Sequence, residues 1–459
     1  MSTSSIPLNQ GPGAVRKVGH WPQWWTDAAD EAWDLYQKMP MPSRKNEEWR
    51  FASIQNLSLE EAVLPGSAHP PLEELPELGI PGAIRAQCVH STCRFQDLPR
   101  EWSEKGVLWL PLNEAAHQHP DLLKKHFMHH EASLENRKFA LLHRAFVETG
   151  AVLYLPARVR IDQPFVCEYW LDGPHASIFP HTLIIAEEGA SVTWIDSFRS
   201  TGNQPGYASA YTEIHAGAGS EVSYLCTQEW NEKVLSFQHG VTHVHRDAST
   251  KVFHFNSGGR YARLETVGRA LGSGARSEML GLSLAHGTQE LDQRTLQMHE
   301  APHTWSNLLF KNALNHRGKT IFSGLIKVFP GARQTDAYQT NRNLLLDSNA
   351  EADSMPGLEI LNDDVKCSHG ATTSQVEEES LFYMLARGIN PEAAKHLIAV
   401  GFCEELLECF GHADISALLS RKIAEKFRAS EKLDPMPNLS DGEVQETTSI
   451  QPGELQGTH

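Results

Sequence analysis

Residues 188–195 read Glu-Gly-Ala-Ser-Val-Thr-Trp-Ile, a glycine turn followed by alternating polar and apolar residues. The same order recurs at 218–226, Ala-Gly-Ser-Glu-Val-Ser-Tyr-Leu-Cys, and a similar turn at 272–276 precedes Leu-Gly-Leu-Ser-Leu at 280–284. Alternation with a period of two predicts short β-strands, and the glycines predict the turns between them. Strong helix signals are scarce between Gly150 and about residue 360, so an alternating βαβ sheet is improbable.

The spacing of the turn glycines narrows the choice of β architecture. Gly189, Gly219, Gly274 and Gly318 are separated by 30, 55 and 44 residues, too irregular for a propeller or a strict short repeat. A solenoid whose turns vary in length is compatible with such spacing. The sequence therefore predicts a parallel β-helix, with a β-sandwich as the alternative.

The N-terminal flank is expected to be helical. Apolar residues recur at helical spacing over residues 21–36 and again over 121–149, where Gly150 is expected to end the helix. Prolines and glycines between residues 64 and 82 predict a loop instead.

Helix signals return after the β-rich region. Ser374 and Glu377 fit a capping box for a helix over 376–387, and Asn390 fits an N-cap for the next helix, with Pro391 at its first position. A third helix is expected over 414–427. We expect four parts: residues 1–150 helical with a linker, 151–373 a β-helix, 374–430 a helical domain, and 431–459 a disordered acidic tail.

Composition limits the classes of function. There are 40 Lys and Arg against 57 Asp and Glu, a net charge of −17, which disfavours nucleic acid as a partner. Seven scattered cysteines do not resemble a dense disulfide framework and favour a reducing, cytoplasmic compartment. The sequence contains neither a secretion signal nor an apolar run long enough to cross a membrane, so no membrane association is expected.

Two enzyme classes stay open as alternatives. His243 and His245, with His254 nearby, could belong to a cupin-like metal-dependent enzyme, although no further ligand follows at a suitable distance. Asp363 and Asp364 are the one candidate carboxylate pair for a β-helix polysaccharide lyase or hydrolase. Adjacent residues on a strand point to opposite sides, so this pair is poorly placed for joint catalysis.

The most informative stretch is Leu-Glu-Ile-Leu-Asn-Asp-Asp-Val-Lys-Cys-Ser-His-Gly-Ala-Thr at residues 358–372. Cys367 and His369 are separated by one residue, so in an extended strand both side chains project to the same side. A thiolate and an imidazole can bind one soft or borderline metal, but two ligands do not close a site. The pattern therefore predicts a site completed by a partner chain.

This stretch, with Glu-Ser-Leu-Phe-Tyr-Met-Leu-Ala-Arg-Gly-Ile at 379–389, resembles the SufB/SufD family of iron-sulfur cluster assembly proteins. Further similar segments are 42–51, 180–190 and 335–346, and the first of these, Pro-Ser-Arg-Lys-Asn-Glu-Glu-Trp-Arg-Phe, makes the sequence most like the SufD branch. The resemblance is scattered over residues 42 to about 410 and covers most of the chain.

The resemblance implies a mainly β protein with α regions, namely a right-handed parallel β-helix core flanked by N-terminal and C-terminal helical regions. It implies a non-catalytic scaffold that pairs with SufB, docks the ATPase SufC and carries a nascent iron-sulfur cluster only transiently, with no permanently bound cofactor. It also places His369 and Cys367 at the cluster-assembly interface. By the same resemblance, the SufC-docking helices would offer Phe382, Tyr383, Arg387 and Phe402.

Overall fold

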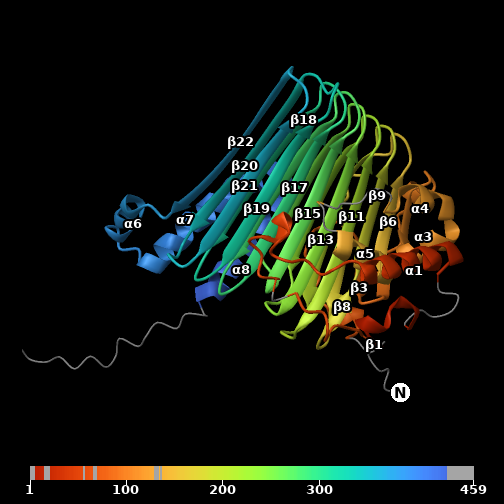
Figure 1. Ribbon diagram of the computed structural model, residues 1–459, viewed down its shortest axis with the longest axis horizontal. Coiled ribbons are helices and arrows are strands. Elements are labelled where there is room, and N and C mark those ends of the chain that lie inside the picture. Colours follow the sequence, from red (N-terminus) through yellow and green to blue (C-terminus); the bar gives the residue numbers. More distant parts are fainter. Residues whose placement is uncertain are drawn as a thin grey trace, which may run out of the picture.

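The computed structural model describes residues 6–14, 21–54, 57–65, 70–128, 134 and 137–431. The core is a parallel β-solenoid of about 8 turns, flanked by helices at its N-terminal and C-terminal ends, which confirms the predicted fold class (Figure 1). The expected tail at 431–459 lies outside the described residues from 432 onward.

Each turn of the solenoid gives one strand to each of two sheets, which we call sheet A and sheet B. Sheet A has 12 strands: β1 (Ile6–Pro7), β2 (Val63–Leu64), β5 (Leu108–Pro111), β6 (Thr149–Leu155), β8 (Ala176–Ile178), β9 (Pro180–Ala186), β11 (Gly206–Ala216), β13 (Val234–Val244), β15 (Tyr261–Ala270), β17 (Glu290–His299), β19 (Lys319–Val328) and β21 (Glu351–Ile360). Sheet B has 10: β3 (Ile84–Val89), β4 (Thr92–Phe95), β7 (Phe165–Leu171), β10 (Ser191–Ser200), β12 (Glu221–Glu229), β14 (Ser249–Asn256), β16 (Arg276–Ala285), β18 (Trp305–Leu314), β20 (Thr335–Leu345) and β22 (Val365–Gln375).

The turns of the solenoid are more regular than the glycine spacing predicted. Ser191, Glu221, Ser249, Arg276 and Trp305 occupy equivalent places on successive strands of sheet B, so each turn takes 27 to 30 residues. The irregular spacing arose because Gly219 and Gly274 are two turns apart, and because Gly318 precedes a strand of sheet A instead of sheet B.

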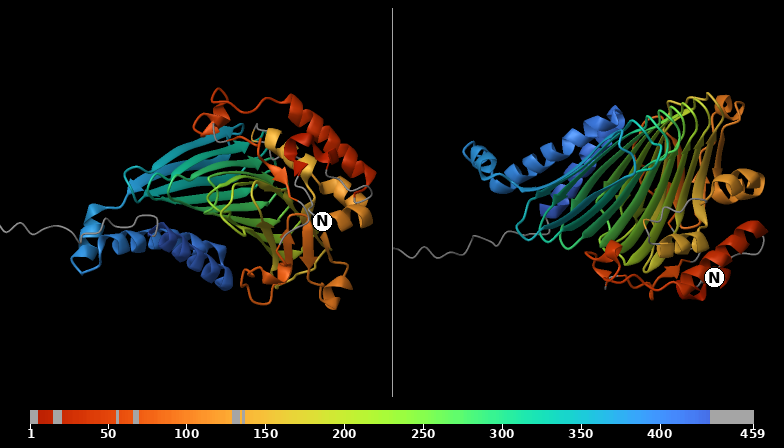
Figure 2. Two further views of the ribbon diagram at one scale, coloured as in Figure 1. Left: turned by 90° about the horizontal axis from the view of Figure 1, so that it is seen from below. Right: turned by 45° about the horizontal axis from the view of Figure 1, so that its top comes forward.

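The helices lie outside the two sheets (Figure 2). On sheet A, the N-terminal helices and the segment 47–54 form one apolar cluster with Phe237, in which the rings of Phe139 and Phe237 stack at 3.7 Å between centroids. On sheet B, Phe253 and its neighbours pack against the C-terminal helices. The helices are α1 (Gln23–Lys38), α2 (Arg100–Ser103), α3 (Leu112–Gln118), α4 (Pro120–His126), α5 (Arg137–Phe146), α6 (Glu378–Leu385), α7 (Pro391–Phe410) and α8 (Ala413–Glu431).

A buried charge network fixes the N-terminal segment on sheet A. Arg263 and Asp292 are joined at 2.8 Å, Arg263 and Glu265 at 2.6 Å, and all three side chains are fully buried. The Arg263 guanidinium also lies 4.0 Å from the ring centroid of Trp49 and donates a hydrogen bond to the carbonyl of Glu48. The segment that carries Trp49 therefore covers these paired charges, each of which would be costly to bury without its partner.

Two local predictions were wrong. The helix expected over 121–149 is divided into α4 and α5. Gly150 does not end a helix, because it lies inside β6, where a Cβ atom would stand 2.2 Å from the carbonyl oxygen of His181. Ser374 does not cap a helix, because β22 continues to Gln375 and pairs with β20.

The N-terminal cap of α7 confirms the prediction for Asn390. Its side-chain oxygen accepts a hydrogen bond from the Ala393 N–H at 2.8 Å, with Pro391 at the first helical position. In the described part of the chain, every helix is too short or too polar to traverse a lipid bilayer.

Candidate functional site

The C-terminal end of the solenoid leaves its last turn uncovered. β21 is the final strand of sheet A and β22 the final strand of sheet B, and each pairs on one side only within the described residues. All residues of these two strands are half-buried or exposed, whereas the inward side chains of the neighbouring β20 are buried. We call this last turn, residues 351–375, the open end.

Cys367 and His369 both belong to the open end and project to the same side of β22, as the one-residue spacing predicted. They pair with Ala337 and Gln339 of β20, whose side chains are buried inside the solenoid. Inward-pointing side chains on the last strand have no following turn to cover them. The structure therefore places both residues at the mouth of the solenoid interior.

The two side chains differ in environment. Cys367 is half-buried and packs, as Leu358 and Val365 do, against a buried apolar cluster that includes Ile326. Burial, reinforced by the nearby Asp336 carboxylate, raises the pKa of the Cys367 thiol. His369 is exposed. Cys367 is thus mainly a neutral thiol in the isolated chain, and a cation or a change of contacts would be needed to favour its thiolate.

Neutral hydrogen-bonding groups line the rest of this mouth. The Asn343 side-chain amide donates to Ser354 Oγ and to Thr373 Oγ1, each at 3.1 Å. Ser354 Oγ in turn donates to Asn341 Oδ1 at 2.7 Å. These bonds connect both strands of the open end to β20, so the last turn is held in position by the turn before it.

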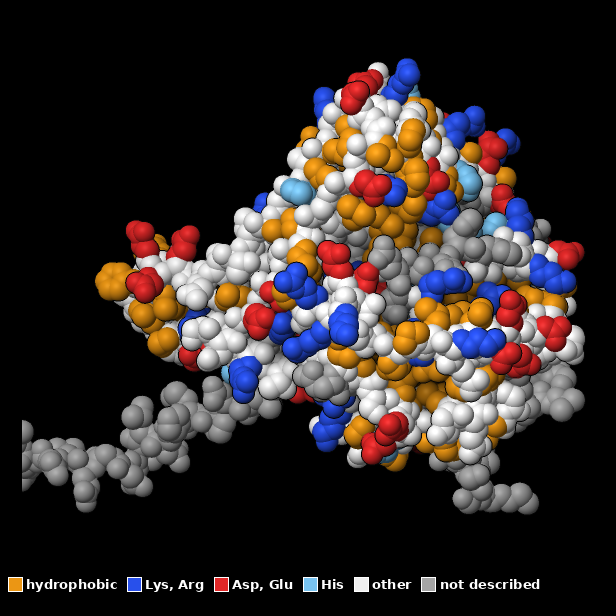
Figure 3. Space-filling view, viewed as in Figure 1, with side chains coloured by type: hydrophobic (Ala, Val, Ile, Leu, Met, Phe, Trp, Pro, Cys, Tyr) orange, Lys and Arg blue, Asp and Glu red, His pale blue; other side chains and the backbone are white. Residues whose placement is uncertain are grey.

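Helix α6 projects beyond the open end and carries exposed apolar side chains. Phe382 is 71% exposed and Tyr383 57% exposed, and the Arg387 guanidinium lies 4.2 Å from the Tyr383 ring centroid. Figure 3 shows hydrophobic side chains gathered on this projection, beside acidic ones. The structure thus brings together three of the four residues predicted for partner docking.

Phe402 does not belong to that group. Its ring faces the Lys311 ammonium of β18 at 4.6 Å, and its carbonyl accepts a hydrogen bond from the same ammonium at 2.8 Å. Sequence reasoning missed Leu385 and Leu397, which are 38% and 53% exposed. The sequence did contain a signal for each: Leu385 follows Phe382 by three positions, on the same face of a helix, and Leu397 lies next to polar residues.

The geometry argues against the two enzyme alternatives. His243 lies in sheet A with its ring stacked on His215 at 4.6 Å, His245 is exposed beyond the end of β13, and His254 is buried on β14 of sheet B. Asp363 and Asp364 are exposed in the connection between β21 and β22, so they do not lie on a strand as assumed. Within the described ranges, no three His, Cys, Asp or Glu side chains are placed to hold a metal ion.

Fold and site together define a parallel β-solenoid protein whose C-terminal end is left uncovered by the described part of the chain. Residues 169–402 match the family described as SUF system FeS cluster assembly, SufBD core domain, and residues 88–166 match the SufBD protein N-terminal region. The first match alone spans just over half of the chain, so the protein belongs to the SufBD family of iron-sulfur cluster assembly proteins.

Relatives of similar length agree with that assignment. The chain is 29% identical over 417 residues to an iron-sulfur cluster assembly SufBD family protein of Staphylococcus epidermidis, covering 85% of this chain and 86% of the relative. A Staphylococcus aureus protein described in the same words is 29% identical over 410 residues, 83% of this chain and 85% of its own length.

Proposed function

We propose that this chain is a SufD-type scaffold subunit that pairs with SufB through the open end and docks the ATPase SufC through α6. In this role it has no active site of its own and works in the cytoplasm. The observation that carries the proposal is the open end itself, where both sheets stop and none of the residues that the structure describes covers them. Exposed strand edges of this kind join a partner's strands through main-chain hydrogen bonds.

The backbone of β21 supports controlled pairing at this edge. The N–H groups of Glu351 and Leu361 donate to Gly318 and Val328 at 3.1 and 2.9 Å, so the alternate residues direct theirs away from β19. Among the described residues, the N–H groups of Ser354 and Leu358 thereby face the unpaired side of β21, while Pro356 between them has no N–H group to offer. An interrupted edge accepts a strand of matching pattern and resists indefinite stacking.

Cluster assembly at the interface follows from the incomplete ligand set. His369 supplies an imidazole and Cys367 a thiol at the mouth, and SufB would supply the remaining thiolate ligands for the nascent cluster. The cluster is cargo, held while it forms and then passed on. A site shared between chains can open when the chains shift, which permits release.

Docking of SufC at α6 rests on the exposed aromatic pair. Phe382 and Tyr383 are large apolar side chains that soluble chains seldom expose together, and such residues are frequent anchors of interfaces. The helices α7 and α8 pack on sheet B, so a force applied at α6 would reach the solenoid through them. Movements of an ATPase could in this way change the contact at the open end.

Cluster reconstitution on the complex with SufB and SufC tests the site. His369→Ala is expected to abolish most of the cluster absorbance, while Ser368→Ala, whose side chain points to the outer face of the same strand, retains it. Undiminished cluster yield with His369→Ala would remove this residue from the site. Copurification of the wild-type and variant chains with SufB separates loss of cluster from loss of pairing.

A further inference from the structure

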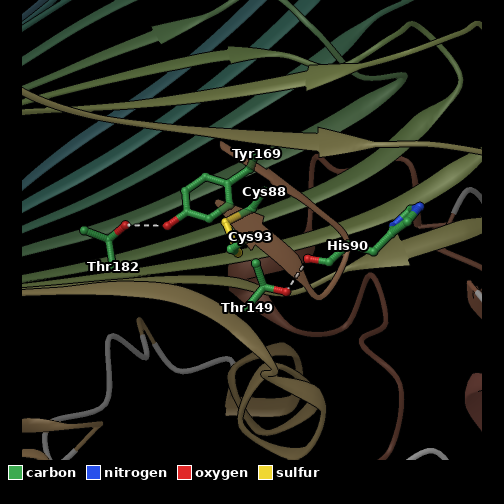
Figure 4. The surroundings of a disulfide bond; sticks show 6 residues. All are labelled: Cys88, His90, Cys93, Thr149, Tyr169 and Thr182. Atoms are coloured by element: carbon green, nitrogen blue, oxygen red, sulfur yellow. Dashed lines mark hydrogen bonds between the residues drawn. A yellow bond between two sulfur atoms is a disulfide. The ribbon is translucent and has the colours of Figure 1, made fainter. Parts of the chain in front are cut away.

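The other end of the solenoid carries a disulfide that the cysteine count did not predict. Strands β3 and β4 form a hairpin in which Val89 pairs with Thr92 and Cys88 with Cys93. The two cysteines are bonded to each other, with their Cα atoms 4.1 Å apart (Figure 4). We propose that Cys88 and Cys93 are a reversible redox couple, opened by a dithiol reductant and closed again by thiol–disulfide exchange.

The hairpin does not depend on the sulfur–sulfur bond for its shape. Arg94 donates a hydrogen bond to Gln87 Oε1 at 3.0 Å, and the Gln96 N–H donates to the Arg85 carbonyl at 2.8 Å. Directly opposed residues in a non-hydrogen-bonded antiparallel pair approach to about 4.5 Å in any case. The two thiols therefore stay adjacent after reduction, which lets the bond form again without refolding.

The short chain segment enclosed by the bond also argues for a redox role over a stabilising one. The cysteines are separated by 5 positions in the sequence. In the chain-entropy view the stabilisation grows with the length of the closed loop, so this bond is at the low end of the scale.

The two sulfur atoms are unequal in access. Cys88 is 1% exposed and belongs to the apolar core with Tyr169, beside which it lies in Figure 4. Cys93 is half-buried at the edge of that core, on the outermost strand of sheet B. Cys93 is the more exposed residue of the two, so we assign the attack to its sulfur and the role of leaving group to Cys88.

Reduction of the Cys88–Cys93 bond takes two thiol–disulfide exchange steps. A thiolate of the dithiol attacks Cys93 Sγ, the sulfur–sulfur bond breaks, and Cys88 leaves as a thiolate that takes up a proton. The second thiol of the reductant then attacks its own sulfur in the mixed disulfide and releases Cys93. The chain gains two electrons and two protons, and the reductant ends as an internal disulfide.

The five remaining cysteines provide internal controls. Cys167, Cys226 and Cys403 are buried, and burial raises the pKa of each thiol. Cys367 and Cys409 are half-buried and are bonded to no other cysteine. After reduction of the folded protein, an alkylating reagent should therefore label Cys88 and Cys93 before the three buried thiols.

Alkylation of the full chain after graded dithiothreitol treatment tests the proposal by mass spectrometry. We expect labels on Cys88 and Cys93 at reductant levels that leave Cys167 and Cys226 unlabelled and shift the unfolding midpoint by less than about 4 °C. Simultaneous labelling of all four cysteines would show a structural disulfide that opens only on unfolding. Labelling of the pair without reductant would show that the bond does not form. Either result overturns the proposal.

Two single variants test the order of attack. With oxidised glutathione, Cys88→Ser, which keeps the accessible Cys93, should form a mixed disulfide at least tenfold faster than Cys93→Ser, which keeps the buried Cys88. Equal rates, or the opposite order, would refute the assigned roles. Both measurements use the isolated chain, so they are independent of pairing with SufB.

Discussion

The two ends of the solenoid stop their sheets in different ways. At the N-terminal end, sheet B finishes in the antiparallel strand β4 of 4 residues, and helices α3 and α4 form an apolar cluster beside β6. At the C-terminal end, sheet B finishes in β22 of 11 residues, with its side chains largely exposed. Short or covered edges resist association, whereas long uncovered edges invite it. One end thus supports the fold, and the other is available to a partner.

The largest expected effect is on the covered part of the solenoid. Arg263→Leu should lower the free energy of unfolding by about 3–5 kcal/mol, because it leaves Glu265 buried without its cation. Chemical denaturation measures this loss. Lys366→Leu on the exposed strand β22 is the control and should change stability by less than about 0.5 kcal/mol. Similar losses for the two variants would contradict the contrast between covered and open ends.

The second largest effect is expected from acid, which should lower the free energy of unfolding through the buried interior. Burial lowers the pKa of His254 to about 3, while an unfolded histidine titrates near pH 6.5. The folded state therefore binds fewer protons between these values, and stability is lost as the pH falls below about 6.5. His254→Gln should reduce the slope of unfolding free energy against pH by about 1.4 kcal/mol per unit at pH 4–6.

The matched control for that slope is His245→Gln. His245 is exposed, so its replacement disturbs no buried contact and shows what the change from histidine to glutamine does at the surface. An unchanged slope with His254→Gln would mean that the ring is protonated in the folded state or accessible to water.

A smaller effect is expected on partner binding at α6. Phe382→Asp should weaken capture of SufC at least tenfold, or about 1.4 kcal/mol, because it removes an exposed aromatic anchor. Surface plasmon resonance with immobilised SufC measures the affinity. Glu392→Gln, on the exposed start of α7, should bind as the unaltered chain does. Unchanged affinity with Phe382→Asp would place the ATPase elsewhere.

The smallest expected effect is on stability at the open end. His369 is exposed and Cys367 only half-buried. His369→Ala should therefore alter the unfolding free energy by less than about 0.5 kcal/mol, even where cluster formation is lost. A loss above 1 kcal/mol in thermal or chemical denaturation would assign His369 a structural role.

The fold could be predicted because strand signals repeat. Successive turns contribute alternating residues, and several of them contribute a turn glycine, so single errors, such as the spacing between Gly274 and Gly318, did not alter the architecture. Local helix signals were less secure. Ser374 fits a helix cap in sequence, but its pairing with Leu344 in sheet B retains it in a strand.

The site could be predicted only in part. The one-residue spacing of Cys367 and His369 was sufficient to place both side chains on one face of a strand. Which helix face meets the solenoid depends on packing with distant residues, so the contact of Phe402 with Lys311 had no signal in the sequence. The pairing of Cys88 with Cys93 similarly required the register of the hairpin.

Hydrogen–deuterium exchange of the chain with and without SufB shows whether the open end is the pairing surface. We expect amides at residues 352–360 and 365–375 to exchange more slowly in the complex, while those of the β3–β4 hairpin exchange as in the isolated chain. A complex that forms with no slowing at the open end would contradict this expectation.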